Sequence, residues 1–258
     1  MELASKIVVV TGGASGIGRA LCRRFKAEGA QAVVVVDMNA AGAEAVAVEI
    51  GGVAMTADVS KESDILHVID QTEHDIGPID LFCSNAGIAR SGGVETPDKA
   101  WQKSWEVNVM SHIYAARALV PRMIERGGGY LLNTVSAAGL LNQIGSASYG
   151  VTKHAAIGFG EWLAITHGHQ GIKVSLLCPQ AVRTAMLTDN ESTRAASVDG
   201  LMEPEELAEV VIDGLRAERF LILPHPEVLE YMRRKTLVKE LPQGQLQEKH
   251  FDRHCRFG

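Results

Sequence analysis

The sequence predicts an α/β fold, in which helices cover both faces of one doubly wound parallel sheet of about seven strands. Short runs that are apolar at every position, such as Ile7–Val10 and Ala32–Val36, alternate with longer segments of helical periodicity. Strands that are apolar on both sides are typical of parallel sheets with helices on each face. No linker divides the chain, so we expect a single dinucleotide-binding catalytic domain over residues 1–258.

The remaining elements follow in order along the chain. Further strands are expected at Val53–Thr56, Asp80–Cys83, Tyr130–Val135, Lys173–Cys178 and Phe220–Leu223. Helices are expected at Gly18–Glu28, Ile65–Ile76, Pro97–Arg126 with an interruption at Pro121, Ser148–His167, and from Glu203-Pro204 onward. Residues 184–203 are polar and aperiodic, which predicts a mobile loop, and residues 233–258 are expected to form a charged tail.

Composition excludes several classes of protein. The formal net charge is −6, from 25 Lys and Arg against 31 Asp and Glu, so we expect no affinity for nucleic acid or for anionic membranes. No apolar run reaches the ~18 residues of a membrane span, and the first residues do not resemble a secretory signal. Four cysteines without a CxxC pair are typical of free thiols in a reducing compartment, so a cytoplasmic location is expected.

Two groups of residues were considered as metal ligands. They are His167 with His169, and His250 with His254 and Cys255. Neither group has an acidic or cysteine partner at a usual ligand spacing, so no metal site is expected.

A glycine-rich loop follows the first predicted strand and leads into a helix. In Thr11-Gly-Gly-Ala-Ser-Gly-Ile-Gly18, Gly12 permits a tight turn, Gly16 a close approach of ligand, and Gly18 close packing of helix on strand. Backbone N–H groups at such a helix N-terminus bind a pyrophosphate, which indicates a Rossmann-type nucleotide site. A P-loop is excluded because Arg19-Ala20 stands where Lys and Ser or Thr would be required, whereas a methyltransferase remains an alternative.

Asp37 ends the second predicted strand, about 20 residues after the glycine loop. A carboxylate at this place accepts hydrogen bonds from the adenosine ribose hydroxyls and repels a 2′-phosphate. Met38 and Asn39 supply no positive charge, so the expected cofactor is NAD, although Arg19 leaves weak use of NADP open.

Tyr149, Lys153 and Ser136 are the candidate catalytic residues. Tyr149 and Lys153 are one helical turn apart on the same face, where the ammonium is expected to lower the pKa of the phenol. Ser136 ends a strand at the edge of the sheet where such folds bind ligands, and can stabilise charge on the same substrate oxygen. Asn108 lies inside a predicted helix; we expect it to kink this helix and hold a water bonded to Lys153.

Taken together, the glycine spacing after Thr11 and the Tyr149-Gly-Val-Thr-Lys153 pair resemble the short-chain dehydrogenase/reductase family, and specifically its NAD-preferring single-domain branch. The resemblance extends from about Lys6 to Leu223. It implies a catalytic set of Asn108, Ser136, Tyr149 and Lys153. It also implies that the cofactor is bound by Gly12, Ser15, Gly16, Ile17, Gly18, Asp37, Met38, Asp58, Val59, Asn85, Ala86, Gly87, Tyr149, Lys153, Pro179, Val182 and Thr184. It further implies a homotetramer or dimer, formed through the helices that hold Asn108 and Tyr149, with Trp162 on the contact face.

Two positions depart from the family pattern. Ser84 stands where a first Asn usually precedes Asn85, and Gln180 replaces the Gly after Pro179. The second change places a side chain near the nicotinamide or the substrate. The expected substrate pocket includes Ala138, Leu140, Gln180, Met186 and Leu187, and its apolar character predicts a small-molecule alcohol or ketone with an apolar body.

Two functions therefore follow from the sequence. The first is an oxidoreductase that transfers a hydride between NAD and a secondary alcohol or ketone. The alternative is an NAD(H)-binding regulatory or scaffold protein of the same fold without turnover, which would usually lack the tyrosine or the lysine.

Overall fold

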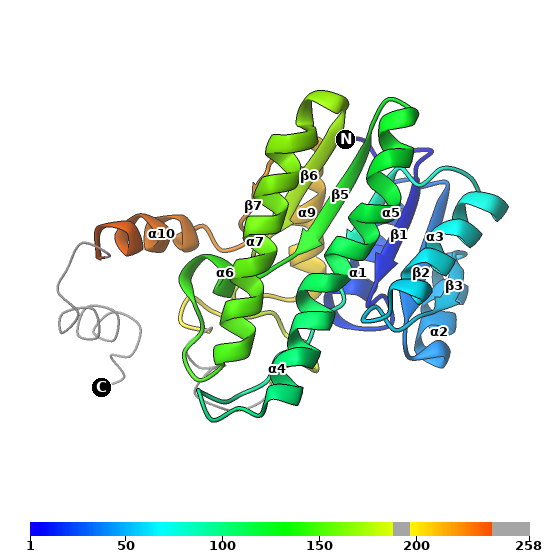
Figure 1. Ribbon diagram of the computed structural model, residues 1–258. Helices are drawn as coiled ribbons and strands as arrows, with labels where there is room; N and C mark the ends of the chain where they lie inside the picture. Colours follow the sequence, from blue (N-terminus) through cyan, green and yellow to red (C-terminus); the bar gives the residue numbers. More distant parts are fainter. Residues whose placement is uncertain (188–196, 239–258) are drawn as a thin grey trace.

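The computed structural model describes residues 1–187 and 197–238, and its described part is built on one parallel sheet in the order β3-β2-β1-β4-β5-β6-β7 (Figure 1). The strands are β1 (Ile7–Thr11), β2 (Ala32–Asp37), β3 (Val53–Thr56), β4 (Leu81–Ser84), β5 (Gly129–Thr134), β6 (Ile172–Leu177) and β7 (Leu221–Ile222). The predicted doubly wound sheet of seven strands is confirmed. The winding reverses between β1 and β4, which pair directly, and this reversal opens a crevice at the carboxyl ends of the strands.

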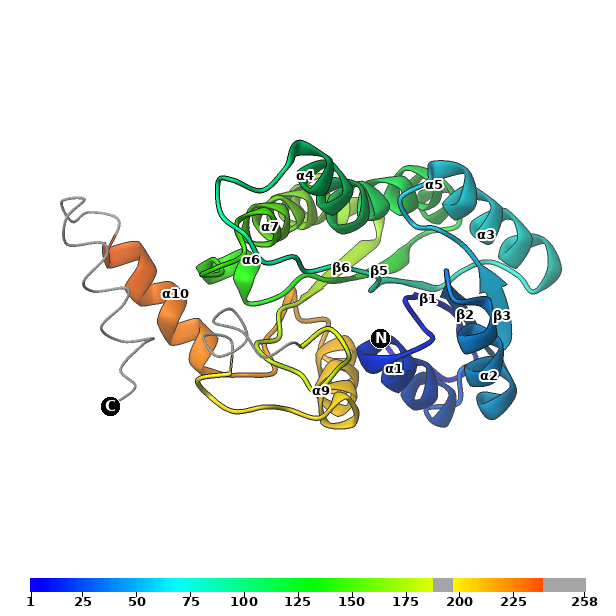
Figure 2. The same ribbon diagram turned by 90° about the horizontal axis from the view of Figure 1, so that it is seen from below.

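Helices cover both faces of the sheet (Figure 2). One face carries α1 (Gly16–Ala27), α2 (Ala40–Ile50) and α9 (Pro204–Arg216). The other face carries α3 (Glu62–Asp75), α4 (Asp98–Trp105), α5 (Ser111–Glu125) and α7 (Ala147–His167). Alternate residues of β1 enter two separate cores: Val9 packs toward α3 and α5, and Val8 and Val10 pack toward α1. This double burial explains the unbroken apolar runs Ile7–Val10 and Ala32–Val36.

The long helix predicted at Pro97–Arg126 is divided differently from the expectation. A π-helical turn, Glu106–Met110, separates α4 from α5, whereas Pro121 lies inside α5 without interrupting it. Pro121 lacks the backbone N–H that would bond the carbonyl of Arg117. Both residues are on the exposed side of the helix, so this carbonyl can be hydrated instead. The kink expected at Asn108 therefore takes the form of a π-helical turn.

Two helices near the crevice were not expected from the sequence. The short α6 (Ala138–Leu141) follows β5, and α10 (Glu227–Val238) lies where only a charged tail was expected to begin. Figure 1 shows α10 extending beside α6, away from the sheet. Of the loop expected at 184–203, residues 188–196 lie outside the described residues, as do residues 239–258 of the expected tail, which include His250, His254 and Cys255.

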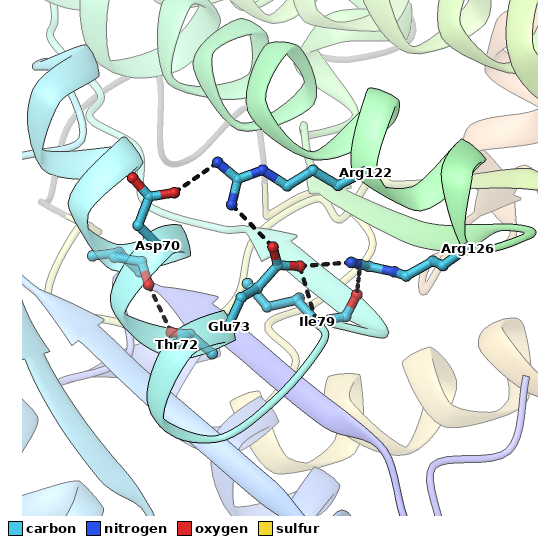
Figure 3. A network of polar contacts seen from close by, with 7 residues as sticks. Asp70, Thr72, Glu73, Ile79, Arg122 and Arg126 are labelled. Carbon is cyan, nitrogen blue, oxygen red and sulfur yellow. Dashed lines mark hydrogen bonds and ion pairs between the residues drawn. The ribbon is translucent and has the colours of Figure 1, made fainter.

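An ionic network joins α3 to α5 at the end of the sheet opposite the crevice (Figure 3). Glu73 Oε2 lies 2.9 Å from Arg122 Nη1, and its Oε1 lies 2.6 Å from Arg126 Nη1. Burial alone raises the pKa of Glu73, but the hydrogen bonds from the two arginines outweigh burial and hold the pKa below its ordinary value. This network stabilises the packing of the two helices and lies away from the crevice.

Candidate active site

A cavity of about 660 Å³ opens at the carboxyl ends of the strands and brings together nearly every residue that the sequence assigned to the site. The assigned residues that line it are Gly12, Ser15, Gly16, Ile17, Gly18, Asp37, Met38, Asp58, Val59, Asn85, Ala86, Gly87, Ser136, Ala138, Tyr149, Lys153, Pro179, Gln180, Val182, Thr184, Met186 and Leu187. The segments after six different strands, β1 to β6, contribute to this wall, as expected for a ligand site at the point where the winding reverses.

Two assigned residues do not line the cavity. Leu140, expected in the substrate pocket, does not line the cavity and belongs instead to the hydrophobic core beside α7, because the turn of α6 directs it inward. Asn108 is fully buried behind the wall. Its Oδ1 accepts a hydrogen bond from Ile88 N at 2.9 Å, and its Nδ2 donates to Ile88 O and Thr152 Oγ1. The side chain thus fastens the π-helical turn to the loop after β4 and to α7.

The glycine loop is packed too tightly for side chains. Gly12 and Gly16 have φ values of 67° and 51°, in the left-handed region. A Cβ atom at Gly18 would lie 2.0 Å from the carbonyl oxygen of Gly12, closer than atoms can approach. Ser15 caps α1 without a side-chain hydrogen bond, so the N–H groups of the first helical turn remain available to an anion.

Asp37 is held at the edge of the cavity by backbone groups. Its Oδ2 accepts from Ala14 N at 3.1 Å and its Oδ1 accepts from Asn39 N at 2.9 Å. Among the described residues that line the cavity, the cationic side chains are Lys103 and Lys153. Lys103 is bonded to Ser60, at 2.8 Å, and Lys153 is bonded to a backbone carbonyl of β5. In the described part of the wall, Asp37 therefore supplies a carboxylate, and no lysine or arginine beside it is free to bind the 2′-phosphate of NADP.

Lys103 is a site residue that the sequence analysis missed. It projects from α4, and its Nζ lies 3.6 Å from Asp58 Oδ2. Burial raises the pKa of Asp58, but hydrogen bonds from Ser60 and the nearby Lys103 outweigh burial and keep the carboxylate ionised. A lysine on a helix is usually a solvated surface residue, so the sequence around Lys103 did not indicate that it would line the cavity. The other lining residues that were not assigned are Ala57, Ile88, Ala89, Val107, Thr134, Val135, Asn142, Gln143 and Ala185.

Ser136, Tyr149 and Lys153 lie together in the lining of the cavity, beyond the carboxyl end of β5. Ser136 has φ 148°, an unusual backbone conformation for a residue other than glycine, and its Oγ accepts from Ala138 N at 3.1 Å and donates to Pro179 O at 3.4 Å. Lys153 Nζ donates to a backbone carbonyl at 3.1 Å and lies 5.6 Å from the centroid of the Tyr149 ring. Three polar groups from two elements are therefore fixed around one point.

The pKa values of these groups are governed by burial. Burial raises the pKa of Tyr149, and the hydrogen bond with Ser136 opposes this only in part. Burial also lowers the pKa of Lys153 to about 8. Burial of the phenol therefore outweighs the lowering of the tyrosine pKa that was expected from the lysine.

His112 is a second residue that the sequence analysis missed. It lies on α5, one turn after Asn108, and only 2% of its surface is exposed. Asn133 lies beside the ring, but within the described part of the chain neither ring nitrogen has a partner at full hydrogen-bond geometry. Burial, with the charge of Lys153 acting in the same direction, lowers its pKa to about 3, so the ring is neutral near pH 7.

The fold and the cavity define an α/β protein with a nucleotide-binding crevice, and comparisons with known proteins assign its family. Residues 6–195 match the family model described as short chain dehydrogenase. The chain is 34% identical over 235 residues to 1-deoxy-11-beta-hydroxypentalenate dehydrogenase of Streptomyces exfoliatus, covering 88% of this chain and 86% of that protein. It is 31% identical over 241 residues to human epidermal retinol dehydrogenase 2, covering 90% and 77%.

Solved structures agree with this assignment. A 3-ketoacyl-(acyl-carrier-protein) reductase from Brucella melitensis, complexed with NADH, has a TM-score of 0.79 and 31% identity and covers 86% of this chain and 96% of its own. A short chain dehydrogenase/reductase from Burkholderia phymatum, in complex with NAD, shares the fold with a TM-score of 0.85 at 24% identity, over 94% of this chain and 98% of its own. The protein belongs to the short-chain dehydrogenase/reductase family and is an oxidoreductase of that family. None of the helices in the described ranges is long and apolar enough to cross a membrane.

Proposed function

We propose that the protein catalyses reversible hydride transfer between NAD and a secondary alcohol or ketone with a largely apolar body. The observation that carries this proposal is the convergence of Ser136, Tyr149 and Lys153 on one end of a cavity whose other end holds the glycine loop and Asp37. A dinucleotide extended between these ends would bring its nicotinamide beside the hydroxyl groups of Ser136 and Tyr149.

Tyr149 would exchange a proton with the substrate oxygen. In the oxidation of an alcohol, the O–H proton passes to Tyr149, the carbinol C–H electron pair leaves as hydride, and the ketone C=O bond forms. NAD, when bound, supplies the acceptor of this hydride and adds a positive charge next to the phenol. That charge opposes the effect of burial on the pKa of Tyr149, so the residue becomes a competent base only in the loaded site.

Ser136 and Lys153 would assist without exchanging hydride. The Ser136 hydroxyl would lie beside the substrate oxygen and stabilise the charge that develops there. Lys153 Nζ is fixed by its bond to the Thr134 carbonyl, at 3.1 Å, and would hold the nicotinamide ribose. Asn108 would act indirectly, because its side chain is occupied in positioning the loop after β4.

The substrate half of the cavity supports an apolar substrate. Its lining includes Ala137, Ala138, Leu141, Ile144, Ala185, Met186 and Leu187. The relatives named above act, by their names, on a pentalenate and on retinol, which are alcohols with apolar skeletons. Charged sugar phosphates are poorly matched to this wall.

NAD is proposed over NADP. Asp37 would lie beside the adenosine ribose of a bound cofactor. Both of its carboxylate oxygens accept from backbone N–H groups, so it could not turn away from a 2′-phosphate without losing those bonds. Both structural relatives described above carry NAD or NADH. We further propose that residues 1–258 act as one catalytic domain, and that two copies pack together through α7, where Trp162 is 54% exposed.

The deciding experiment is a panel of secondary alcohols with NAD and NADP, followed by the absorbance of the reduced nicotinamide. We expect turnover with NAD, and a much lower kcat/KM with NADP. The alternative is a regulatory or scaffold protein that binds NAD(H) without turnover. Tight binding of NADH with no turnover of any alcohol or ketone in the panel would favour that alternative and contradict the proposal.

A further inference from the structure

Gln180, in the wall of the cavity, has a side-chain amide whose orientation is fixed by neighbours that lie far away in the sequence. Its Nε2 donates to Asp199 Oδ2 at 2.9 Å, and Tyr231 Oη donates to the other carboxylate oxygen, also at 2.9 Å. The Gln180 backbone N–H donates to His225 Nδ1 at 3.2 Å. The loop after β6, the segment before α9 and helix α10 are thereby joined at the substrate end of the cavity.

The carboxylate of Asp199 determines which atom of the Gln180 side-chain amide is left without a partner. An ionised carboxylate accepts hydrogen bonds and cannot donate them, so Gln180 must present its NH₂ group to Asp199. Its Oε1 therefore points away from Asp199, and this oxygen is buried without a hydrogen-bond partner within the described ranges. A buried acceptor without a partner is unfavourable, so this oxygen is a candidate to accept a hydrogen bond from a bound ligand.

The position of Gln180 links this acceptor to the reacting end of the cavity. Its neighbour Pro179 accepts, through its carbonyl oxygen, from Ser136 Oγ at 3.4 Å and from Ala137 N at 2.8 Å. Gln180 follows that carbonyl directly in the chain and lines the same cavity. A group bound by Oε1 would thus lie close to a substrate oxygen held by Ser136.

We propose that Gln180 is a specificity-determining residue, whose Oε1 accepts a hydrogen bond from a second hydroxyl of the substrate, within one or two carbons of the reacting carbon. The preferred substrates are then apolar diols and the corresponding hydroxy ketones. Asp199 and Tyr231 are positioning residues that hold the amide in this orientation. The inference rests on the proposed function and narrows its substrate class.

The test compares alcohols that differ only by the second hydroxyl. The probes are cyclohexanol, trans-1,2-cyclohexanediol and 1,3-cyclohexanediol, with 2-butanol and 2,3-butanediol as an acyclic pair, each assayed with NAD. For the unchanged protein, we expect kcat/KM to be about tenfold or more higher for at least one diol than for its mono-alcohol, as one hydrogen bond provides. Gln180→Met keeps the length and volume of the side chain and removes the acceptor. We expect this variant to lose that preference, mainly through a higher KM for the diol.

The mono-alcohols and the cofactor are internal controls. In Gln180→Met, the change in kcat/KM for the mono-alcohol measures any general effect on the pocket, and the loss for the diol should exceed it about tenfold, while the KM for NAD reports on cofactor binding. Asp199→Asn leaves Gln180 intact but allows its amide to turn, so the diol preference should fall in this variant too. A thermal melt of each variant confirms that it is folded.

Three results would overturn the inference. The first is an equal loss for diol and mono-alcohol, which would give Gln180 a general structural role. The second is a raised KM for NAD alone, which would mean that Oε1 serves the cofactor. The third is a preference for the diol that persists in Gln180→Met. Absence of turnover of every probe by the unchanged protein would instead contradict the proposed function, and the inference with it.

Discussion

Gly18→Ala tests whether the glycine loop is built for close packing, and its effect can be derived from the structure. The added Cβ would lie 2.0 Å from Gly12 O and 2.7 Å from Asn85 Nδ2. The first neighbour is backbone, which moves only with the whole loop. Overpacking of this kind costs about 1–3 kcal/mol. For a domain of this size, such a loss lowers Tm by roughly 2–12 °C.

The same displacement should weaken cofactor binding. The N-terminus of α1 begins at Gly16, so a shift at Gly18 moves the N–H groups proposed to hold the pyrophosphate. We expect the Kd for NADH, measured by fluorescence, to rise at least tenfold, alongside the lower Tm from calorimetry. Gly168→Ala is the matched control, because a Cβ there has no heavy atom within 4 Å.

The control should be neutral, or more stable by up to about 1 kcal/mol, since alanine reduces the conformational entropy of the unfolded chain. It should bind NADH as the unchanged protein does. If Gly18→Ala melted and bound NADH like Gly168→Ala, the reasoning about the loop would be refuted.

Three further predictions concern other parts of the molecule. Asp37→Ser should raise kcat/KM with NADP relative to NAD by tenfold or more, measured in the alcohol assay, because the repulsion of a 2′-phosphate is removed; an unchanged ratio would contradict the role of Asp37. Burial lowers the pKa of His112 to about 3 in the folded protein. Between pH 6.5 and 3 only the unfolded chain takes up this proton, so the free energy of unfolding decreases as the pH is lowered. Between pH 6.5 and 5, the free energy of unfolding measured in urea should therefore fall by roughly 2 kcal/mol less for His112→Leu than for the unchanged protein. If the two proteins gave parallel curves of unfolding free energy against pH, His112 would not titrate in this way. Trp162→Arg should reduce the mass measured by light scattering, because Trp162 is the exposed aromatic on the proposed contact face of α7; an unchanged mass would place any contact elsewhere.

Local patterns were sufficient to predict the sheet and much of the cavity wall. The strands could be identified because both of their faces are buried, which leaves β1 and β2 apolar at every position except the last. The glycine loop, Asp37 and the Tyr149–Lys153 pair could be identified because each depends on close neighbours in the chain. Parallel strands then place their carboxyl ends at one edge, so these separate motifs meet.

Contacts between distant segments could not be predicted in this way. The bond between Gln180 and Asp199 joins the loop after β6 to a segment for which the sequence shows no periodicity. The place of Lys103 beside Asp58 depends on how α4 packs. Helix α10 was missed because five of its twelve residues are charged and one of its apolar residues, Leu229, is 42% exposed, which weakens the amphipathic pattern.

The central claim is that Tyr149 exchanges a proton with the substrate at a site already occupied by NAD. The most direct test is Tyr149→Phe, assayed with NAD and the best alcohol of the panel, with the Kd for NADH measured in parallel. The account predicts a fall in kcat/KM of at least about 100-fold, with the Kd for NADH within about twofold of that of the unchanged protein. Turnover by Tyr149→Phe within about threefold of the unchanged protein would contradict it.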